Sequence, residues 1–215
     1  SRMPKVIGPL KRFRSFYVLP NIDFPKLLIP ICDNRKVLSK SLDIYNAISI
    51  FQIVRSNILR ILVVLRILWV VIPNRIYIYG NYQSNSIIKL FLDKFKVKAA
   101  NFSVHNASIG PGTKIIVSPI TKHGEILGYI KISNNKIRKE MLYHEYRTYN
   151  ILNTLNLEKG VVNNDFKFAI IGNFSALFLK RNKTELRRSN QKLEERHVLF
   201  LADLSIKSRS SIQLL

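Results

Sequence analysis

The chain has 215 residues, of which 47% are hydrophobic and 22% charged; this composition excludes wholesale disorder and allows one large or two small domains. The formal net charge of +22 favours anionic partners such as nucleic acid, acidic lipid or phosphorylated metabolites, although AT-rich codon usage would give the same lysine excess. A single cysteine, Cys32, excludes an internal disulfide and a multi-cysteine zinc site. Cys32 fits a reducing compartment, so we expect a cytoplasmic location.

Residues 1–98 form the first expected region, which is basic and predicted to be irregular or helical. Pro20, Pro25 and Pro30 recur every five residues, a spacing that breaks helices and favours extended segments and turns. The region ends in a short amphipathic helix around Phe91 that leads into the next domain. The basic N-terminus precedes no long apolar run, so the sequence does not predict a cleavable signal peptide.

Residues 46–72 are the most apolar stretch of the chain and predict an amphipathic helix. Arg60 and Arg66 interrupt the apolar run, and a central arginine costs about 2.5–3.5 kcal/mol in a membrane-spanning helix. A membrane crossing is therefore disfavoured. Two interpretations remain: the helix packs on its own domain with its arginines reaching water, or it lies on an anionic membrane surface, peripheral to the inner membrane.

Residues 99–182 predict an α+β domain, in which an antiparallel sheet carries one packed helix. β-branched and alternating runs favour strands over 99–104, 114–120 and 125–133, and apolar spacing favours a helix over 136–155. Gly172-Asn173 suits the tight turn of a hairpin between strands 167–171 and 174–179. Residues 183–215 are expected to be mostly helical.

Four residues of this domain form a candidate nucleotide site. Gly110 and Gly112 lie in the loop before the second strand, where backbone can approach phosphates. Lys131 interrupts an apolar strand, and Glu145 lies on the expected apolar stripe of the helix with Ile137, Met141, Tyr149 and Leu152. A carboxylate on such a stripe needs a partner, and Lys131 is on the strand that directly precedes the helix. Taken singly, these residues are typical of an ordinary loop, a solvated lysine and a helix-surface glutamate.

Three strands, a helix and two strands, with glycines, lysine and glutamate in that order, resemble the small lobe of protein-kinase-like folds. The stretch 108–155 also resembles phosphotransferase-like proteins of bacterial surface-polysaccharide gene clusters, which are similar to aminoglycoside phosphotransferases. The resemblance implies ATP and magnesium as cofactors, with Lys131 contacting the phosphates, Glu145 orienting Lys131, and Gly110 and Gly112 approaching the nucleotide. It also implies that residues 176–180 lead to an adenine-facing hinge.

The sequence departs from that family in its catalytic residues. None of the four histidines is followed two positions later by aspartate, so no His-x-Asp catalytic loop is present and we assign no catalytic or metal-binding residue. We expect a truncated phosphotransferase-like protein in which residues 183–215 begin a missing large lobe. Two alternatives stay open: a basic nucleic-acid-binding protein, for which no recognised motif is present, and a membrane-surface accessory protein that uses residues 46–72.

Overall fold

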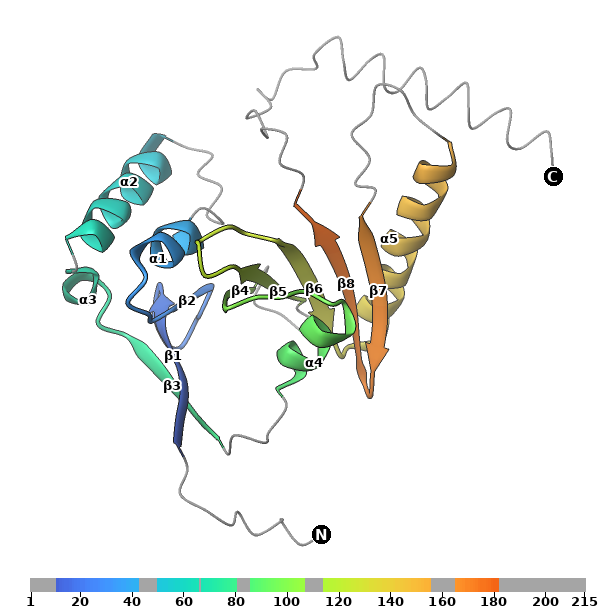
Figure 1. The fold of residues 1–215 in the computed structure, drawn as a ribbon, viewed down its shortest axis with the longest axis horizontal. Coiled ribbons are helices and arrows are strands. Elements are labelled where there is room, and N and C mark those ends of the chain that lie inside the picture. The colour runs from blue at the N-terminus through green and yellow to red at the C-terminus, as the bar shows by residue number, and fades with distance from the viewer. Residues whose placement is uncertain are drawn as a thin grey trace, which may run out of the picture.

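The computed structural model describes residues 11–42, 50–65, 67–80, 86–106, 114–155 and 165–181. These residues form one eight-stranded antiparallel sheet, in the order β3-β1-β2-β4-β5-β6-β8-β7, with five helices around it (Figure 1). The strands are β1 (Lys11–Leu19), β2 (Leu27–Pro30), β3 (Arg75–Gly80), β4 (Asn101–Asn106), β5 (Ile115–Ile120), β6 (Gly128–Ser133), β7 (Phe166–Ile171) and β8 (Phe174–Lys180). The helices are α1 (Arg35–Leu42), α2 (Ile50–Val64), α3 (Leu68–Val71), α4 (Ile87–Lys94) and α5 (Lys136–Thr154). The expected α+β class is confirmed.

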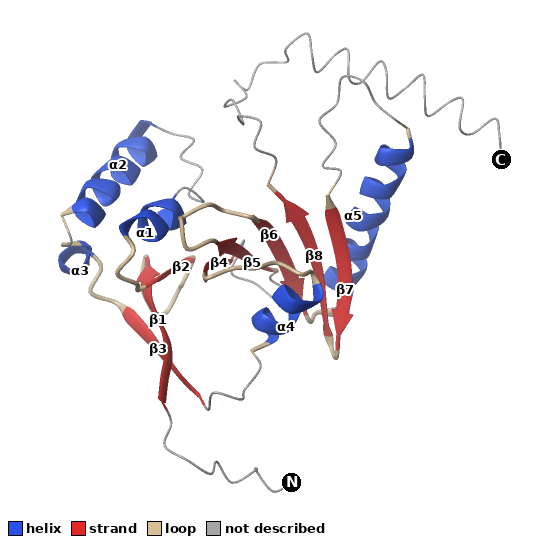
Figure 2. Cartoon of the chain, in the orientation of Figure 1, coloured by secondary structure: helices blue, strands red, loops and turns tan. Residues whose placement is uncertain are grey.

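The N-terminal region differs from its expected irregular and helical structure, because it supplies three strands to the same sheet (Figure 2). The prolines that suggested irregularity lie at strand ends: Pro20 directly follows β1 and Pro30 is the last residue of β2. Within β1, Phe16 and Val18 are buried while Tyr17 is only partly buried, as expected of alternating side chains on a pleated strand. The sheet therefore continues across residue 98, where we had placed a domain boundary.

From β4 to β8 the expected elements are present within one to three residues of their expected bounds. The helical structure expected over 183–215 lies outside the described residues. β4, β5 and β6 precede α5, and β7 and β8 form the hairpin. Gly172 has a φ of +54°, which glycine adopts at little cost and which a tight hairpin turn of the primed type requires. Asn135 caps α5, because its side-chain Oδ1 accepts a hydrogen bond from the Arg138 backbone N–H at 3.2 Å.

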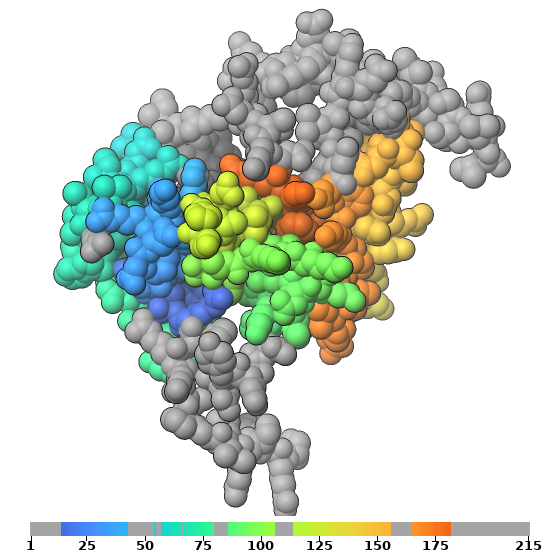
Figure 3. All heavy atoms as spheres, viewed as in Figure 1, coloured from blue at the N-terminus to red at the C-terminus, as the bar shows by residue number. Residues whose placement is uncertain are grey.

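Helix α4 covers one face of the sheet and shares the main core with it (Figure 3). Phe91 and Phe95 of α4 stack on each other, and Phe95 stacks on Phe178 of β8 with ring centroids 5.8 Å apart. Ile130 and Ile132 of β6 belong to the same buried cluster. The core of this domain is therefore an aromatic layer between α4 and the C-terminal strands.

Helices α1 and α5 lie on the opposite face. Side chains alternate along a strand, so Leu28 packs against the α4 core while Leu27 and Ile29 cluster with Leu42 of α1. At the other end of the sheet, Phe166 and Phe168 of β7 contact tyrosines of α5. The two helices thus flank the central strands of this face.

The apolar stretch expected as one helix over 46–72 forms two helices, α2 and α3, in the residues described. Their outward sides expose large apolar side chains, and among them Val54, Ile58, Ile61 and Leu65 are at least 50% exposed and follow helical spacing along one stripe. Of the helices that the described residues form, none has both the length and the apolar character to cross a membrane.

The aromatic layer under α4 generates a stability prediction. Phe178→Ala leaves a cavity against Phe95, so we expect the free energy of unfolding, measured by urea denaturation, to fall by about 3–5 kcal/mol. Ile170 of the neighbouring strand is 64% exposed, and Ile170→Ala should change stability by no more than about 0.5 kcal/mol. Equal losses in both variants would contradict this placement of the core.

Candidate functional site

Lys131 and Glu145 form an ion pair that joins β6 to α5. The Lys131 Nζ donates to Glu145 Oε1, and the two side chains are 18% and 28% exposed. Only Asn134 and Asn135 separate β6 from α5, so the helix turns back beside the strand that carries the lysine. The pair expected from the sequence is therefore present, on the sheet face opposite α4.

Aromatic contacts fix the rotation of α5 that directs Glu145 toward the sheet. Tyr146 stacks on Phe168 with ring centroids 5.5 Å apart, and Tyr149 packs on Phe166 at 5.3 Å. These contacts lie one residue from Glu145 and one turn beyond it. Burial, and secondly the negative charge of Glu145, raise the pKa of Tyr149, which indicates that this carboxylate acts on its aromatic surroundings.

The apolar stripe expected on α5 is partly wrong. Ile137 and Met141 are 67% and 52% exposed, whereas Leu142 is buried at 2% exposure. The packed face follows Leu142, Tyr146 and Tyr149 because the phenylalanines of β7 offer aromatic partners there. Glu145 borders this face. Its pairing with Lys131 is therefore present, although the packed stripe of α5 is displaced by one residue from the expected stripe.

The two glycines of the candidate site, Gly110 and Gly112, lie outside the described residues. Their segment connects β4 to β5, whose last paired positions are Asn106 and Ile115. Their expected approach to a nucleotide stays a prediction.

A row of residues across four strands places a histidine on the same face as Lys131. The strand register pairs His105 with Ile116, Ile116 with Lys131, and Lys131 with Leu177, and directly opposed residues point to the same face. Two strand spacings of about 4.8 Å place His105 and Lys131 about 10 Å apart at the backbone. Burial lowers the pKa of His105 to about 4, so this imidazole is neutral near pH 7.

Two buried serines lie beside His105 on that face. Ser103 is directly opposite Ser118, and both side chains are 0% exposed. Among the described residues, the two serine hydroxyls and the His105 Nε2 have no hydrogen-bond partner. A buried polar group without a partner costs about 1–3 kcal/mol, so this cluster is costly to folding. This cluster was not predicted from the sequence, although Ser103 and His105 alternate with Phe102 and Val104, a pattern that is typical of a strand with one polar face.

No cluster of three or more His, Cys, Asp or Glu side chains suited to a metal ion is present among the described residues. Lys131, Glu145 and the His105 row therefore make up a cation, its counter-ion and neutral polar groups on one sheet face. Such a set can bind an anion and offer hydrogen bonds to it.

Comparison with known proteins gives no match: no family model, curated protein or solved structure resembles the chain significantly.

The depressed pKa of His105 predicts how stability depends on pH. As pH falls from about 6.5, the ordinary histidine value, toward about 4, the unfolded chain takes up a proton that the folded chain does not. Stability contributed by neutral His105 is therefore present above pH 6.5 and lost toward pH 4.

Denaturation of the parent and His105→Gln at pH 7 and pH 4.5 tests this dependence. We expect the parent to lose more stability between the two pH values than His105→Gln does. His123→Gln, a matched change of a histidine on an exposed turn, should behave like the parent. A parent and His105→Gln with equal pH dependence would show that His105 titrates normally.

Proposed function

We propose that this chain binds a nucleoside triphosphate and is the nucleotide-binding small lobe of a phosphotransferase-like protein. The observation that carries the proposal is the ion pair between Lys131 on a central strand and Glu145 on the helix that follows it. In kinase-like sites, a strand lysine contacts the nucleotide phosphates and a helix glutamate holds that lysine in place. The order β4, β5, β6, α5, β7, β8 supplies the same arrangement of elements.

The environment of Lys131 is suited to phosphate. The Lys131 side chain is only 18% exposed, so its attraction to an anion is screened less than that of a lysine on an open surface. Glu145 restricts the position of the ammonium without enclosing it, because the carboxylate side chain is itself 28% exposed. His105, Ser103 and Ser118 lie on the same face, but both serine side chains are 0% exposed, so a bound nucleotide would contact Lys131 and not the serine hydroxyls.

Magnesium would neutralise the phosphates in such a lobe. The described residues do not bring together three acidic or histidine ligands, and the function proposed for them is binding. A phosphotransferase reaction would need the base and metal ligands of a large lobe. Surface-polysaccharide synthesis stays the proposed setting, on the resemblance alone.

Thermal melting with ATP tests the nucleotide site. A ligand that binds the folded chain raises its Tm, and we expect ATP to do so for the parent. Lys131→Met should weaken ATP binding about tenfold or more, since a charge-assisted contact to phosphate is lost. Glu145→Gln should have a smaller effect, because the ammonium remains but is held less firmly.

Lys89→Met is the matched control, because Lys89 is an exposed lysine on α4, which covers the opposite face. It should respond to ATP as the parent does. A parent whose Tm is insensitive to ATP, or a Lys131→Met variant that responds fully, would contradict the proposed function.

A second candidate function is attachment to an anionic membrane surface through α2 and α3. Trp69 and Val70 of α3 are 54% and 59% exposed, and the stripe of α2 is exposed to a similar degree. A groove of about 270 Å³ opens between the two helices and Leu19-Pro20, and its lining is apolar. An interfacial helix needs such an apolar side, and the net charge of +22 would attract acidic lipid.

Cosedimentation with liposomes containing acidic lipid tests this attachment. Burial of a large apolar side chain contributes about 1.5–3 kcal/mol, so Ile61→Ser combined with Trp69→Ser should weaken liposome binding at least tenfold. Ile137→Ser combined with Ile170→Ser removes two equally exposed apolar side chains from α5 and β7 and should leave binding unchanged. Absence of binding by the parent, or an equal loss in the control, would exclude the attachment.

A further inference from the structure

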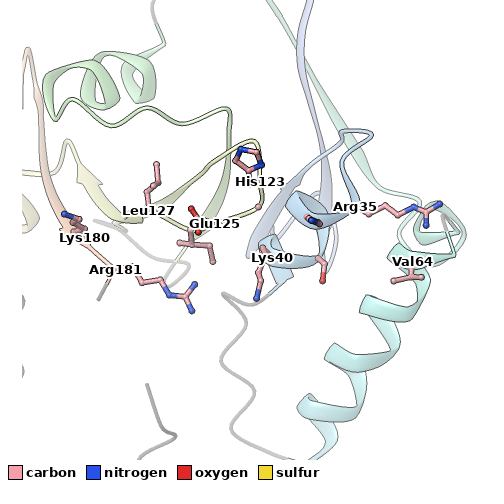
Figure 4. A pocket seen from close by; sticks show the side chains of 12 residues that line it. Arg35, Lys40, Val64, His123, Glu125, Leu127, Lys180 and Arg181 are labelled. Carbon is pink, nitrogen blue, oxygen red and sulfur yellow. The ribbon is translucent and has the colours of Figure 1, made fainter. Parts of the chain in front are cut away.

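A basic pocket lies between three elements that are far apart in the sequence. Its volume is about 630 Å³, and it opens between α1, the connection from β5 to β6, and the end of β8 (Figure 4). Five cationic side chains line it against one carboxylate; the charged residues are Arg35, Lys36, Lys40, Lys180, Arg181 and Glu125. Figure 4 shows Lys40 and Arg181 extending from different elements toward the same open side of the pocket.

Hydrogen bonds tie the walls of the pocket together. The Asn34 side chain donates through Nδ2 to the Lys122 carbonyl at 2.6 Å and accepts through Oδ1 from the Lys36 N–H at 3.0 Å. One side chain thus caps α1 and holds the β5–β6 turn. The Arg181 N–H donates to the Leu127 carbonyl at 3.0 Å, which fixes the third wall.

Close packing also keeps the turn against α1. Gly124 has a φ of +88°, and a Cβ at this position would lie 2.9 Å from the Lys36 Cβ. Only glycine fits such a contact at such a φ without displacing the helix. The cationic side chains therefore extend from a frame whose backbone is already in place, which lowers the entropy lost when a ligand binds.

The positive charge of the pocket is only partly neutralised within the protein. Lys180 pairs with Asp165 at 2.6 Å. Among the residues that the structure describes, no ion pair involves Arg35 or Arg181. Like charges on one pocket repel each other, and an anion that enters it relieves that repulsion. A guanidinium group such as that of Arg181 also favours phosphate, because it can donate two parallel hydrogen bonds to the phosphate oxygens.

We propose that this pocket binds a small molecule that carries two or more linked phosphoryl groups. The volume is typical of small-molecule sites, which span about 300–1,000 Å³, and the cationic side chains of the lining favour a ligand with more than one negative charge. The pocket is distinct from the surroundings of Lys131, because Leu127 and Lys131 are four positions apart along the chain, about 13 Å in an extended strand. Lys131 is not among the residues that line the pocket, and the inference does not rest on the proposed nucleotide site.

Calorimetric titration of inorganic pyrophosphate into the full chain tests the pocket. We expect pyrophosphate to bind the parent and the affinity to fall at least tenfold in Arg35→Gln combined with Arg181→Gln. Lys89→Gln combined with Lys94→Gln removes the same charge from α4 and should keep the parental affinity within twofold. Lys131→Met should also keep it, whereas this variant loses ATP binding if the nucleotide proposal is correct.

Three outcomes would overturn the pocket assignment. If pyrophosphate does not bind the parent, linked phosphoryl groups are excluded as the ligand of the pocket. Equal weakening in the α4 control shows that binding follows net charge alone. Loss of pyrophosphate binding in Lys131→Met, with full binding in the arginine variant, assigns the anion to the other site.

Discussion

Strand β6 contributes side chains to the packing on both faces of the sheet, and the rest of the structure depends on its alternation of apolar and charged residues. Ile130 and Ile132 enter the aromatic core under α4, while Lys131 between them pairs with Glu145 on the other side. A shift of one residue in register would exchange the two faces, burying the lysine in the core. Gly128 holds the register, because a Cβ there would lie only 2.3 Å from the Leu179 carbonyl oxygen. Core, ion pair and strand register thus share one six-residue strand.

The polar groups on the α5 face contribute little to the stability of the fold. A partly exposed ion pair contributes at most about 1 kcal/mol, and a buried hydroxyl without a partner is unfavourable. Near Lys131, the protein therefore carries polar groups that lower its free energy of unfolding, namely His105, Ser103 and Ser118. At the other end of the same strand, the basic pocket concentrates cations on a firmly held backbone. Both proposed sites depend on strand β6, which carries Lys131 of one and adjoins the turn that lines the other.

The sequence was sufficient to predict those elements and contacts whose local pattern agrees with their tertiary partners. Strand alternation, the Gly172 turn and the lysine-glutamate pair lie within 81 residues of contiguous chain, from Asn101 to Arg181, and each has its partner nearby. The N-terminal strands were missed because prolines at their ends concealed short buried runs. The serine and histidine cluster and the basic pocket need the register of the sheet, since Arg35 and Arg181 become neighbours of one cavity only through long-range folding. Gly110 and Gly112 stay untested.

The pairing of β2 with β4 is the shortest connection described within the sheet, and separation of the strands is expected to begin there. This seam joins the three N-terminal strands to the other five, yet only Leu27 with His105 and Leu28 with Val104 are in register across it. The β6–β8 pairing, by contrast, runs over six positions. Helix α1 bridges the seam, because Leu42 packs with Leu27 while Val37 packs with Ile120 of β5. The sheet therefore consists of a three-stranded and a five-stranded part that are joined by a short pairing. Helix α1, which also forms a wall of the basic pocket, packs against both parts and holds them together.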